Sequence, residues 1–365
     1  MKVSAVSLLS TRLSNQLLTW SGSKLYVYPI KGLRGIELES AEIGPQGIHH
    51  DRRFMLYEVQ ATTGVLKKIQ LDTHPACALF EPRIVPGSQE GGSEVVVSFL
   101  GNPPRDGEPG DDDHGSVSVP LEPDLSTLEK ISVDLHGSPA SAYRMGTGYD
   151  NWFSQRFGVE TMLVYLGDGR RAVLGKTLPP KAAQGQQQRG WISSLTSYIP
   201  GARQGGEDST PWITFSDVAP LMVASESSLQ DVRSRLLGGY PVEMYKFRPN
   251  IVVDGQAEDA WAEDFWAELR IGPGNTLQLT GNCVRCVSLN VDYKTGKPAE
   301  GEEGNVLKRL MKDRRVDAGS KWSPVFGRYA FLDGRHNETI TVSVGDGVEV
   351  TRRNTERSVW DWPDL

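Results

Sequence analysis

Short runs of alternating apolar and polar residues recur along this 365-residue chain and constrain its fold more than any other feature. Such alternation places every second side chain on one face of a strand, as a half-buried β-sheet requires. Gly, Pro, Asn and Asp occupy the gaps between the runs and favour turns. The segments that read as strands are Leu25–Tyr28, Ile36–Ile43, Phe54–Tyr57, Glu94–Phe99, Met162–Tyr165, Asn250–Val253, Thr276–Leu279 and Thr339–Val344. Many short strands with turn signals between them predict barrels or a sandwich.

Few segments of the sequence favour helices. The spacing Ser227-x-x-Gln230 predicts a capping box in front of an apolar stripe. Asp150 is predicted to cap a second, short helix, and residues 306–311 carry a third apolar stripe. We interpret all three stripes as core packing. The predicted fold is therefore mainly β, in the α+β class, with a few peripheral helices.

The chain length is compatible with two domains, and two segments suit a packed core poorly. Residues 101–115 combine Pro and Gly with a run of aspartates, and residues 178–211 are rich in Gln, Gly and Pro. We interpret the first segment as a solvated surface loop and the second as a low-complexity linker. The predicted division is an N-terminal extension 1–23, a first domain 24–177, the linker 178–211, a second domain 212–352 and a tail 353–365.

The net charge and the number of cysteines indicate which functions are disfavoured and in which cellular compartment the protein is expected. The formal charge of −7 disfavours a nucleic-acid binder, and the three cysteines fit a reducing compartment. The sequence contains no run of 18 apolar residues, so no transmembrane anchor is expected. Residues 1–23 include Lys2 and Arg12 but no acid, which is compatible with either a mitochondrial presequence or a disordered extension. We predict a cytoplasmic protein, with a mitochondrial location as the alternative.

The segment Cys283-Val-Arg-Cys286 is the strongest chemical signal. A guanidinium beside Cys286 favours the thiolate, which is the form that binds metals or attacks substrates. Structural zinc needs four ligands, and no second pair of this kind exists in the sequence. A redox pair normally opens a helix, whereas residues 287–291 alternate like a strand. Two buried cysteines, a thiolate ligand to a soft metal and a nucleophile remain open as interpretations.

Three further segments place cations and an amide near predicted strand ends. Phe247-Arg-Pro-Asn250 offers a planar guanidinium suited to phosphate and an amide that both donates and accepts. Tyr28–Arg34 brings Lys31 beside a glycine, and Asp51–Phe54 opens a strand with two arginines. Together with the thiolate, these groups suit an anionic, phosphate-bearing cofactor whose metal takes one protein sulfur.

The order and spacing of these motifs over roughly residues 24–350 resemble the MOSC proteins, named for the C-terminal domain of molybdenum cofactor sulfurase. Within that family the chain is most similar to the mitochondrial amidoxime-reducing component group. The motifs that carry the resemblance are Leu25–Lys31, Asp51–Met55, Phe215–Asp217, Ser225–Leu229, Phe247–Ile251, Ala262–Trp266, Cys283–Cys286 with Asp292 and Thr295-Gly296, and Ser323–Gly327.

The resemblance implies a β-barrel-like N-terminal domain and a β-barrel MOSC domain with a molybdopterin cofactor between them. It implies that Cys286 is the molybdenum ligand; pyridoxal phosphate is not expected. The predicted cofactor contacts are Lys31, Gly32, Arg52, Arg53, Ser216, Arg248, Asn250 and Arg285. Two positions depart from the family pattern, since Gly32 replaces a serine and Ser216–Pro220 replaces a hydroxyl-bearing segment.

The resemblance also implies an activity, the reduction of small N-hydroxylated molecules such as amidoximes. Relatives from animals take electrons from cytochrome b5 reductase through cytochrome b5, so donors of this type are predicted partners. No cysteine follows Cys286, so the sequence lacks a ferredoxin cluster, and electrons must come from a separate protein. Residues 308–315 carry five cations that either dock such a donor or form a solvated helix face. Asp217 and Asp292 are the candidate catalytic acids beside Cys286.

Two other functions stay open on the sequence. The chain could carry the molybdenum cofactor or transfer sulfur without turning over a substrate, with Cys283 holding a persulfide. It could also be a thiol enzyme or scaffold that binds no molybdenum.

Overall fold

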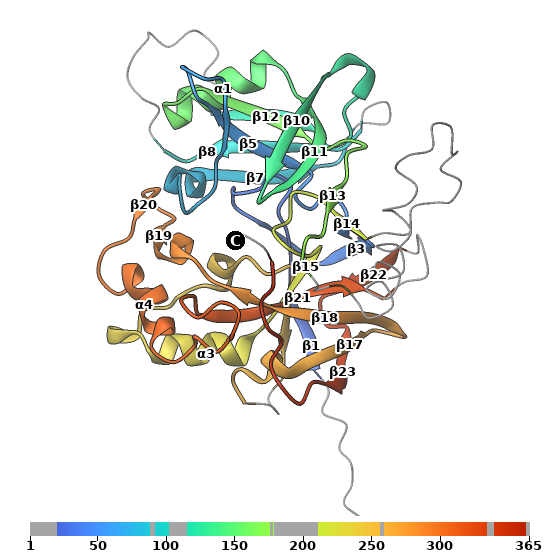
Figure 1. Cartoon of the computed structure of the whole chain (residues 1–365), viewed down its shortest axis with the longest axis vertical. Coiled ribbons are helices and arrows are strands. Elements are labelled where there is room, and N and C mark those ends of the chain that lie inside the picture. The colour runs from blue at the N-terminus through green and yellow to red at the C-terminus, as the bar shows by residue number, and fades with distance from the viewer. Residues whose placement is uncertain are drawn as a thin grey trace, which may run out of the picture.

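The computed structural model describes residues 20–87, 92–101, 115–175, 178, 211–255, 259–333 and 339–362. Within these ranges the chain is mainly β, as the alternating segments predicted, and it forms two β-rich parts that lie one above the other (Figure 1). Residues 102–114 and 179–210, which make up nearly all of the predicted loop and linker, lie outside the described residues. So do residues 1–19 of the predicted extension.

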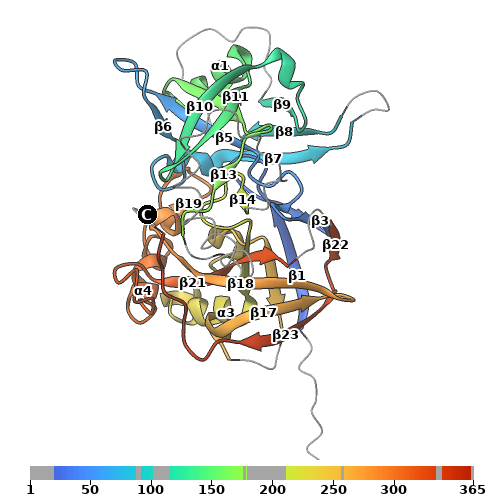
Figure 2. The ribbon, with the colours of Figure 1, turned by 45° about the vertical axis from the view of Figure 1, so that its right-hand side comes forward.

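Among the described residues, seven strands close a barrel in the lower part of the molecule (Figure 2). In order around the barrel they are β16 (Ile251–Asp254), β15 (Leu221–Ser225), β21 (Val325–Leu332), β18 (Asn275–Val284), β17 (Trp266–Ile271), β23 (Gly347–Arg353) and β1 (Trp20–Val27), which pairs with β16 again. Only β15 and β16 run parallel in this ring. Because Leu25 lies opposite Ile251, the first strand of the chain closes a barrel whose other strands come from the second half of the sequence.

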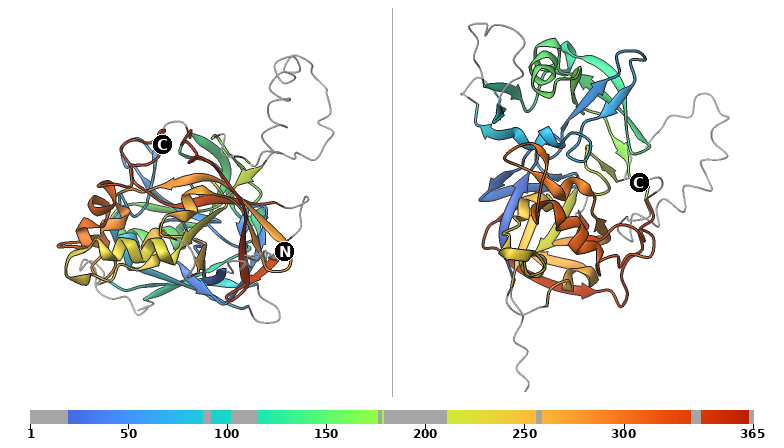
Figure 3. Two further views of the ribbon diagram at one scale, coloured as in Figure 1. Left: turned by 90° about the horizontal axis from the view of Figure 1, so that it is seen from below. Right: turned by 90° about the vertical axis from the view of Figure 1, so that its left-hand side faces the viewer.

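The alternation within β1 divides its side chains between two cores. Leu25 and Val27 join a cluster to which all seven barrel strands contribute, whereas Tyr26 joins a cluster under the helices, as does Tyr28 just after the strand. Helices α3 (Glu226–Ser234) and α4 (Val306–Met311) cover this second cluster on one side of the barrel (Figure 3). This division follows from the two-residue period of a strand, which sends successive side chains to opposite faces.

The upper part consists of two sheets on a shared core, and α1 (Thr147–Phe157) packs against it. One sheet has the order β10 (Glu129–Leu135), β11 (Ser138–Arg144), β12 (Thr161–Tyr165), β5 (Phe54–Val59) and β6 (Leu66–Lys68), and the other has β7 (Phe80–Val85), β8 (Glu94–Phe99) and β9 (Ser116–Pro120). The remaining strands are β2 (Ile36–Leu38), β3 (Ser40–Gly44), β4 (Gly47–Ile48), β13 (Arg171–Ala172), β14 (Trp212–Ile213), β19 (Val291–Asp292), β20 (Lys297–Pro298) and β22 (Ile340–Ser343). Short 3-10 helices span Pro75–Leu79, Leu125–Thr127, Leu237–Gly239, Met244–Phe247, Ala262–Phe265, Val287–Asn290 and Glu303–Asn305.

Several predicted elements need correction. The segment Ile36–Ile43 is not one strand, because β2 pairs with β1 in the barrel sheet while β3 pairs with β22 and β4. The cap of α3 is Ser225 rather than Ser227, since its side chain accepts a hydrogen bond from the Ser227 backbone. Asp150 lies inside the first turn of α1 instead of capping it. Its carboxylate accepts from the Leu163 backbone and from Arg144, which ties the helix to the sheet.

The predicted tail is packed where the structure describes it. Residues 354–362 return over the barrel, and the side chains of Trp360 and Trp362 are buried in the cluster under the helices. The Trp360 backbone donates to Asp317, and Trp362 Nε1 donates to the His136 carbonyl at 3.5 Å. None of the helices in the described ranges is both long enough and apolar enough to cross a bilayer.

Candidate functional site

A cavity of about 470 Å³ lies where the upper sheets meet the barrel. Among the described residues that line it, the basic side chains are Lys31, Arg52, Lys68, Arg248 and Arg285, and the acidic ones are Asp72 and Asp217. This cationic excess occurs in a chain whose formal charge is −7. A cleft lined by one sign of charge concentrates ligands of the opposite sign, so the cavity suits an anion.

Nearly all of the site residues predicted from the sequence line this cavity. They are Lys31, Gly32, Arg52, Ser216, Asp217, Arg248, Asn250, Arg285 and Cys286. Arg53 and Asp292 do not belong to the lining. Arg53 donates to the Gly167 carbonyl at 2.6 Å, and the Asp292 carboxylate accepts from Lys294 and Thr295 within its own turn.

Cys286 follows the end of β18 and exposes its thiol, whereas Cys283 lies within β18 and is buried. The prediction of a strand after Cys286 is wrong, because Val287–Asn290 form a 3-10 helix. The tight turn buries Leu289, exposes Val287 and leaves Ser288 Oγ 3.1 Å from the Cys286 sulfur. Of the two thiols, that of Cys286 is the one accessible to a ligand in the cavity.

The Arg285 guanidinium does not contact Cys286 in the way the sequence suggested. Its Nη1 donates to the Cys283 sulfur at 2.9 Å, and its Nη2 donates to the Phe247 carbonyl at 2.9 Å. Burial lowers the pKa of Arg285, but the neighbouring Cys283, Cys286 and Tyr329 together outweigh burial, so the net shift is upward. Arg285 Nε is buried and has no hydrogen-bond partner among the residues that the structure describes.

Arg52 and Arg248 stack on the same aromatic ring. Their guanidinium carbons lie 4.6 Å and 4.4 Å from the Tyr28 ring centroid. Asn250 fixes Arg52, because its Oδ1 accepts from Arg52 and from the Met222 backbone, and its Nδ2 donates to the Tyr26 carbonyl. Arg248 Nη1 donates to the Leu33 carbonyl at 2.6 Å. The two arginines are therefore held in place before any ligand arrives.

Backbone strain is concentrated at the cavity. Of the five non-glycine residues with positive φ in the described ranges, Arg52, His136 and Arg248 belong to the lining. Such residues cost of order 1–3 kcal/mol each and persist at sites where the surroundings impose them. Gly32 lies at φ +90°, and a Cβ there would approach the Ile69 carbonyl oxygen to 3.3 Å, so the family's serine would be strained at this position.

A chain of hydrogen-bonded titratable groups lies along one wall of the cavity. The sequence suggested two of them, Lys31 and Asp217, as site residues, but not His136 or Lys68. Lys31 pairs with Asp217, Asp217 Oδ1 lies 3.1 Å from His136 Nε2, and His136 Nδ1 lies 2.9 Å from Lys68 Nζ. The one local signal for His136 is the His-Gly turn, which here joins β10 to β11. No pattern in the neighbouring sequence predicted Lys68 as a site residue, because β6 meets the turn that carries His136 only in the tertiary structure.

Burial and the neighbouring charges shift the protonation of this chain. Burial lowers the pKa of Lys31 to about 8, although Asp217 opposes that shift. Burial also lowers the pKa of His136. Burial would raise the pKa of Asp217, but Lys31 and His136 hold it well below its usual range. Asp217 is therefore ionised at neutral pH and accepts hydrogen bonds from both partners.

Comparison with known protein families gives a matching family model for each half of the chain. The family model for the MOSC N-terminal beta barrel domain matches residues 22–160, and the model for the MOSC domain matches residues 210–349. The chain is 37% identical to mitochondrial amidoxime-reducing component 1 of Homo sapiens over 143 residues, which cover 37% of this chain and only 38% of that protein.

Two further relatives align over most of this chain. Mitochondrial amidoxime reducing component 2 of Macaca fascicularis is 26% identical over 332 residues, which cover 89% of this chain and 82% of the relative. Molybdenum cofactor sulfurase of Oryza sativa subsp. japonica is 22% identical over 327 residues, which cover 87% of this chain and 33% of the relative.

Proposed function

The chain belongs to the MOSC-domain proteins, and from this membership we propose that it binds a molybdenum cofactor and reduces N-hydroxylated molecules with it. The observation that carries the proposal is the accessible Cys286 thiol in a cavity lined by a cationic excess. A soft thiolate suits molybdenum, and guanidinium groups suit the phosphate of a pterin. Relatives named as amidoxime-reducing components support the choice of reaction.

The residues present fit such a cofactor. Arg285 and the stacked Arg52 and Arg248 line the cavity and suit an anionic group, while Cys286 offers one sulfur. When bound, the cofactor supplies two-electron redox chemistry at the metal. The protein then binds the anionic end, orients the substrate oxygen and provides protons. Arg53 and Asp292, which lie outside the lining, are left in structural roles.

A second function has one observation in its favour. Cys283 also lines the cavity, and its sulfur accepts a hydrogen bond from Arg285. That contact would stabilise a persulfide anion as well as a thiolate, and one relative is named a molybdenum cofactor sulfurase. A carrier of the cofactor or of sulfur, which does not turn over a substrate, is therefore the alternative.

Electrons are proposed to come from a separate protein of the cytochrome b5 type, reduced by a cytochrome b5 reductase-like enzyme. The relatives' names favour the mitochondrial alternative over the cytoplasmic location predicted from composition. The division into domains 24–177 and 212–352 also remains a proposal, although β1 belongs physically to the barrel.

The test starts from protein made in a host that synthesises the molybdenum cofactor. Molybdenum and pterin content are measured, and amidoxime reduction is followed with an artificial electron donor. We expect Cys286→Ser to abolish turnover, because the metal loses its only protein sulfur, and Cys283→Ala to retain most of it. Loss of turnover in Cys283→Ala alone would reverse the ligand assignment. Loaded protein without any reductase activity would favour the carrier.

A further inference from the structure

We propose that Lys68 is the proton donor of this cavity and that His136, oriented by Asp217, positions it. This inference rests on the proposed function, because it supplies a step that the reduction requires. Cleavage of an N–O bond consumes two electrons from the external donor and two protons, and it releases the oxygen as water. One of those protons must reach the leaving oxygen inside the cavity.

The hydrogen bonds fix the direction in which the protons point. An ionised Asp217 only accepts, so His136 Nε2 carries the hydrogen that lies between them at 3.1 Å. A neutral imidazole then has a lone pair on Nδ1, which must accept from Lys68 Nζ at 2.9 Å. The Lys68 ammonium has three N–H groups, and one of them is used in this bond. Within the ranges that the structure describes, the other two make no hydrogen bond, so they are available to a ligand in the cavity that Lys68 lines.

The turn that carries His136 is built to reach the cavity. His136 and Gly137 join β10 to β11 with φ of +59° and +73°, and the Gly137 backbone donates to Asp134 at 3.0 Å. Two consecutive positive φ values mark the tight turn that suits a two-residue hairpin. His136 accepts the strained position at its tip, which a glycine or asparagine would occupy more readily.

A buried arginine locks this turn to the segment that carries Asp217. Arg171 donates to the carbonyls of Leu135 and Ser138 on the hairpin, at 2.9 and 3.3 Å, and to the carbonyl of Ser216 at 2.6 Å. Trp362 holds the His136 carbonyl from the other side. The distance from His136 to Asp217 is therefore set by the fold and not by a mobile loop.

Burial lowers the pKa of His136. Asp217 opposes this shift, and Lys31 and Lys68 add to it, so the net direction favours the neutral ring. A neutral His136 is what the proposed arrangement needs, because a protonated ring would repel Lys68 and could not accept its hydrogen. After Lys68 gives up a proton, it regains one from solvent, since its side chain is only half-buried.

The test separates proton donation from charge. Lys68→Met should lower kcat by on the order of 10²-fold with little change in KM, the effect typical of a lost general acid. Lys68→Arg keeps the charge, but a guanidinium does not release a proton at accessible pH, so it should not restore kcat. Lys67→Met, the exposed neighbour on β6, is the control and should behave as the unmodified protein.

His136→Asn tests the positioning role, because asparagine tolerates positive φ. It should lower kcat while molybdenum and pterin content stay unchanged. Independently of activity, ring nitrogen NMR of the cofactor-free protein should show a neutral His136 with its hydrogen on Nε2, and Asp217→Asn should disturb that signal.

Each outcome bears on a different claim. Full kcat in Lys68→Arg would overturn proton donation, and loss of the cofactor in Lys68→Met would make Lys68 a cofactor ligand instead. A hydrogen on Nδ1 of His136 would overturn the arrangement. Absence of turnover in the loaded, unmodified protein would overturn the proposed function itself, whatever the NMR spectrum shows.

Discussion

Two adjacent arginines of this chain differ in whether they line the cavity. Arg52 and Arg53 are adjacent, yet Arg52 stacks on Tyr28 in the cavity wall while Arg53 donates to Gly167 and lies over the Tyr165 ring. The strained backbone of Arg52, at φ +51°, separates the two side chains. The sequence offered both arginines as cofactor contacts, and only their backbone angles distinguish them.

Arg248 provides a prediction at this scale. Arg248→Ala removes a guanidinium that stacks on Tyr28 beside Arg52, and a buried phosphate would lose a charge-assisted partner. We expect lower pterin occupancy, measured as pterin and molybdenum per folded protein. Arg53→Ala is the matched control and should keep full occupancy. Equal occupancy in the two variants would remove Arg248 from the cofactor site.

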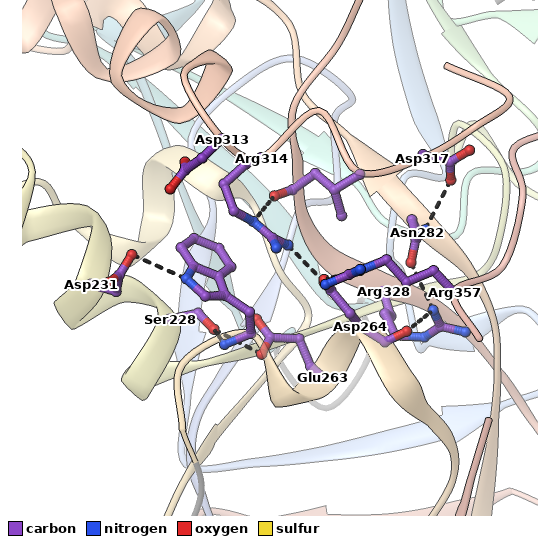
Figure 4. Close-up of polar contacts among 12 residues, drawn as sticks. Ser228, Asp231, Glu263, Asp264, Asn282, Asp313, Arg314, Asp317, Arg328 and Arg357 are labelled. Atoms are coloured by element: carbon purple, nitrogen blue, oxygen red, sulfur yellow. Dashed lines mark hydrogen bonds and ion pairs between the residues drawn. The ribbon is translucent and has the colours of Figure 1, made fainter. Parts of the chain in front are cut away.

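At the scale of elements, a buried polar network joins α3, the 3-10 helix Ala262–Phe265 and the C-terminal segment (Figure 4). Asp264 accepts from Arg314 at 2.7 Å and from Arg357 at 2.8 Å. The adjacent Glu263 accepts from Ser228 at 2.8 Å, and its other carboxylate oxygen is buried without a hydrogen-bond partner in the described part of the chain. Among the described residues, Asp264 is thus paired with two cations, while Glu263 forms no ion pair.

Glu263 makes stability depend on pH. Burial, opposed in part by Ser228, raises the pKa of Glu263 from 4.5 to about 7. Between these values the unfolded chain loses a proton that the folded chain keeps, so stability falls as pH rises through this window. Glu263→Gln should therefore stabilise the protein at pH 8, by up to about 3 kcal/mol, and change little at pH 4.

Urea unfolding at the two pH values measures this difference. The exposed Glu300→Gln serves as the control and should leave both curves unchanged. An equal effect of Glu263→Gln at pH 4 and pH 8 would show that Glu263 does not titrate with folding.

At the scale of the whole molecule, the predicted donor-docking segment is smaller than the sequence suggested. Arg314 is buried and paired with Asp264, and Arg309 pairs with Glu302, so neither offers a free charge on the surface. Lys308, Lys312 and Arg315 remain exposed. Within residues 308–315, these three are the cations left to dock an acidic redox protein.

Reversing the charge of two of these exposed lysines tests docking of the electron donor. Lys308→Glu combined with Lys312→Glu should slow turnover driven by a cytochrome b5-type donor severalfold and reduce its dependence on salt, because attraction between exposed charges is screened. Turnover with an artificial donor should stay unchanged. Lys130→Glu, on an exposed position of β10, is the control. Unchanged rates with the protein donor would place docking elsewhere.

The sequence by itself determined those features of the protein that depend on residues close together in the chain. Alternation along short runs predicted the mainly β fold, because strand faces and turns follow local periods and backbone sterics. The motif around Cys286 predicted a candidate metal ligand and left open whether the thiol is buried. The errors of the sequence-based predictions were also local. The alternating residues after Cys286 form a 3-10 helix, and the residue that caps α3 is Ser225 instead of Ser227.

Only the tertiary structure decided the contacts between distant residues. β1 closes the barrel against a strand more than 200 positions away, Lys31 meets Asp217 across 186 positions, and Lys68 meets His136 across 68. Arg285 binds Cys283 rather than its neighbour Cys286 for the same reason, since packing against Phe247 directs its guanidinium. No periodic pattern in the sequence predicts which residues line a cavity between two folded parts, because its walls exist only once the long-range strand pairings have formed.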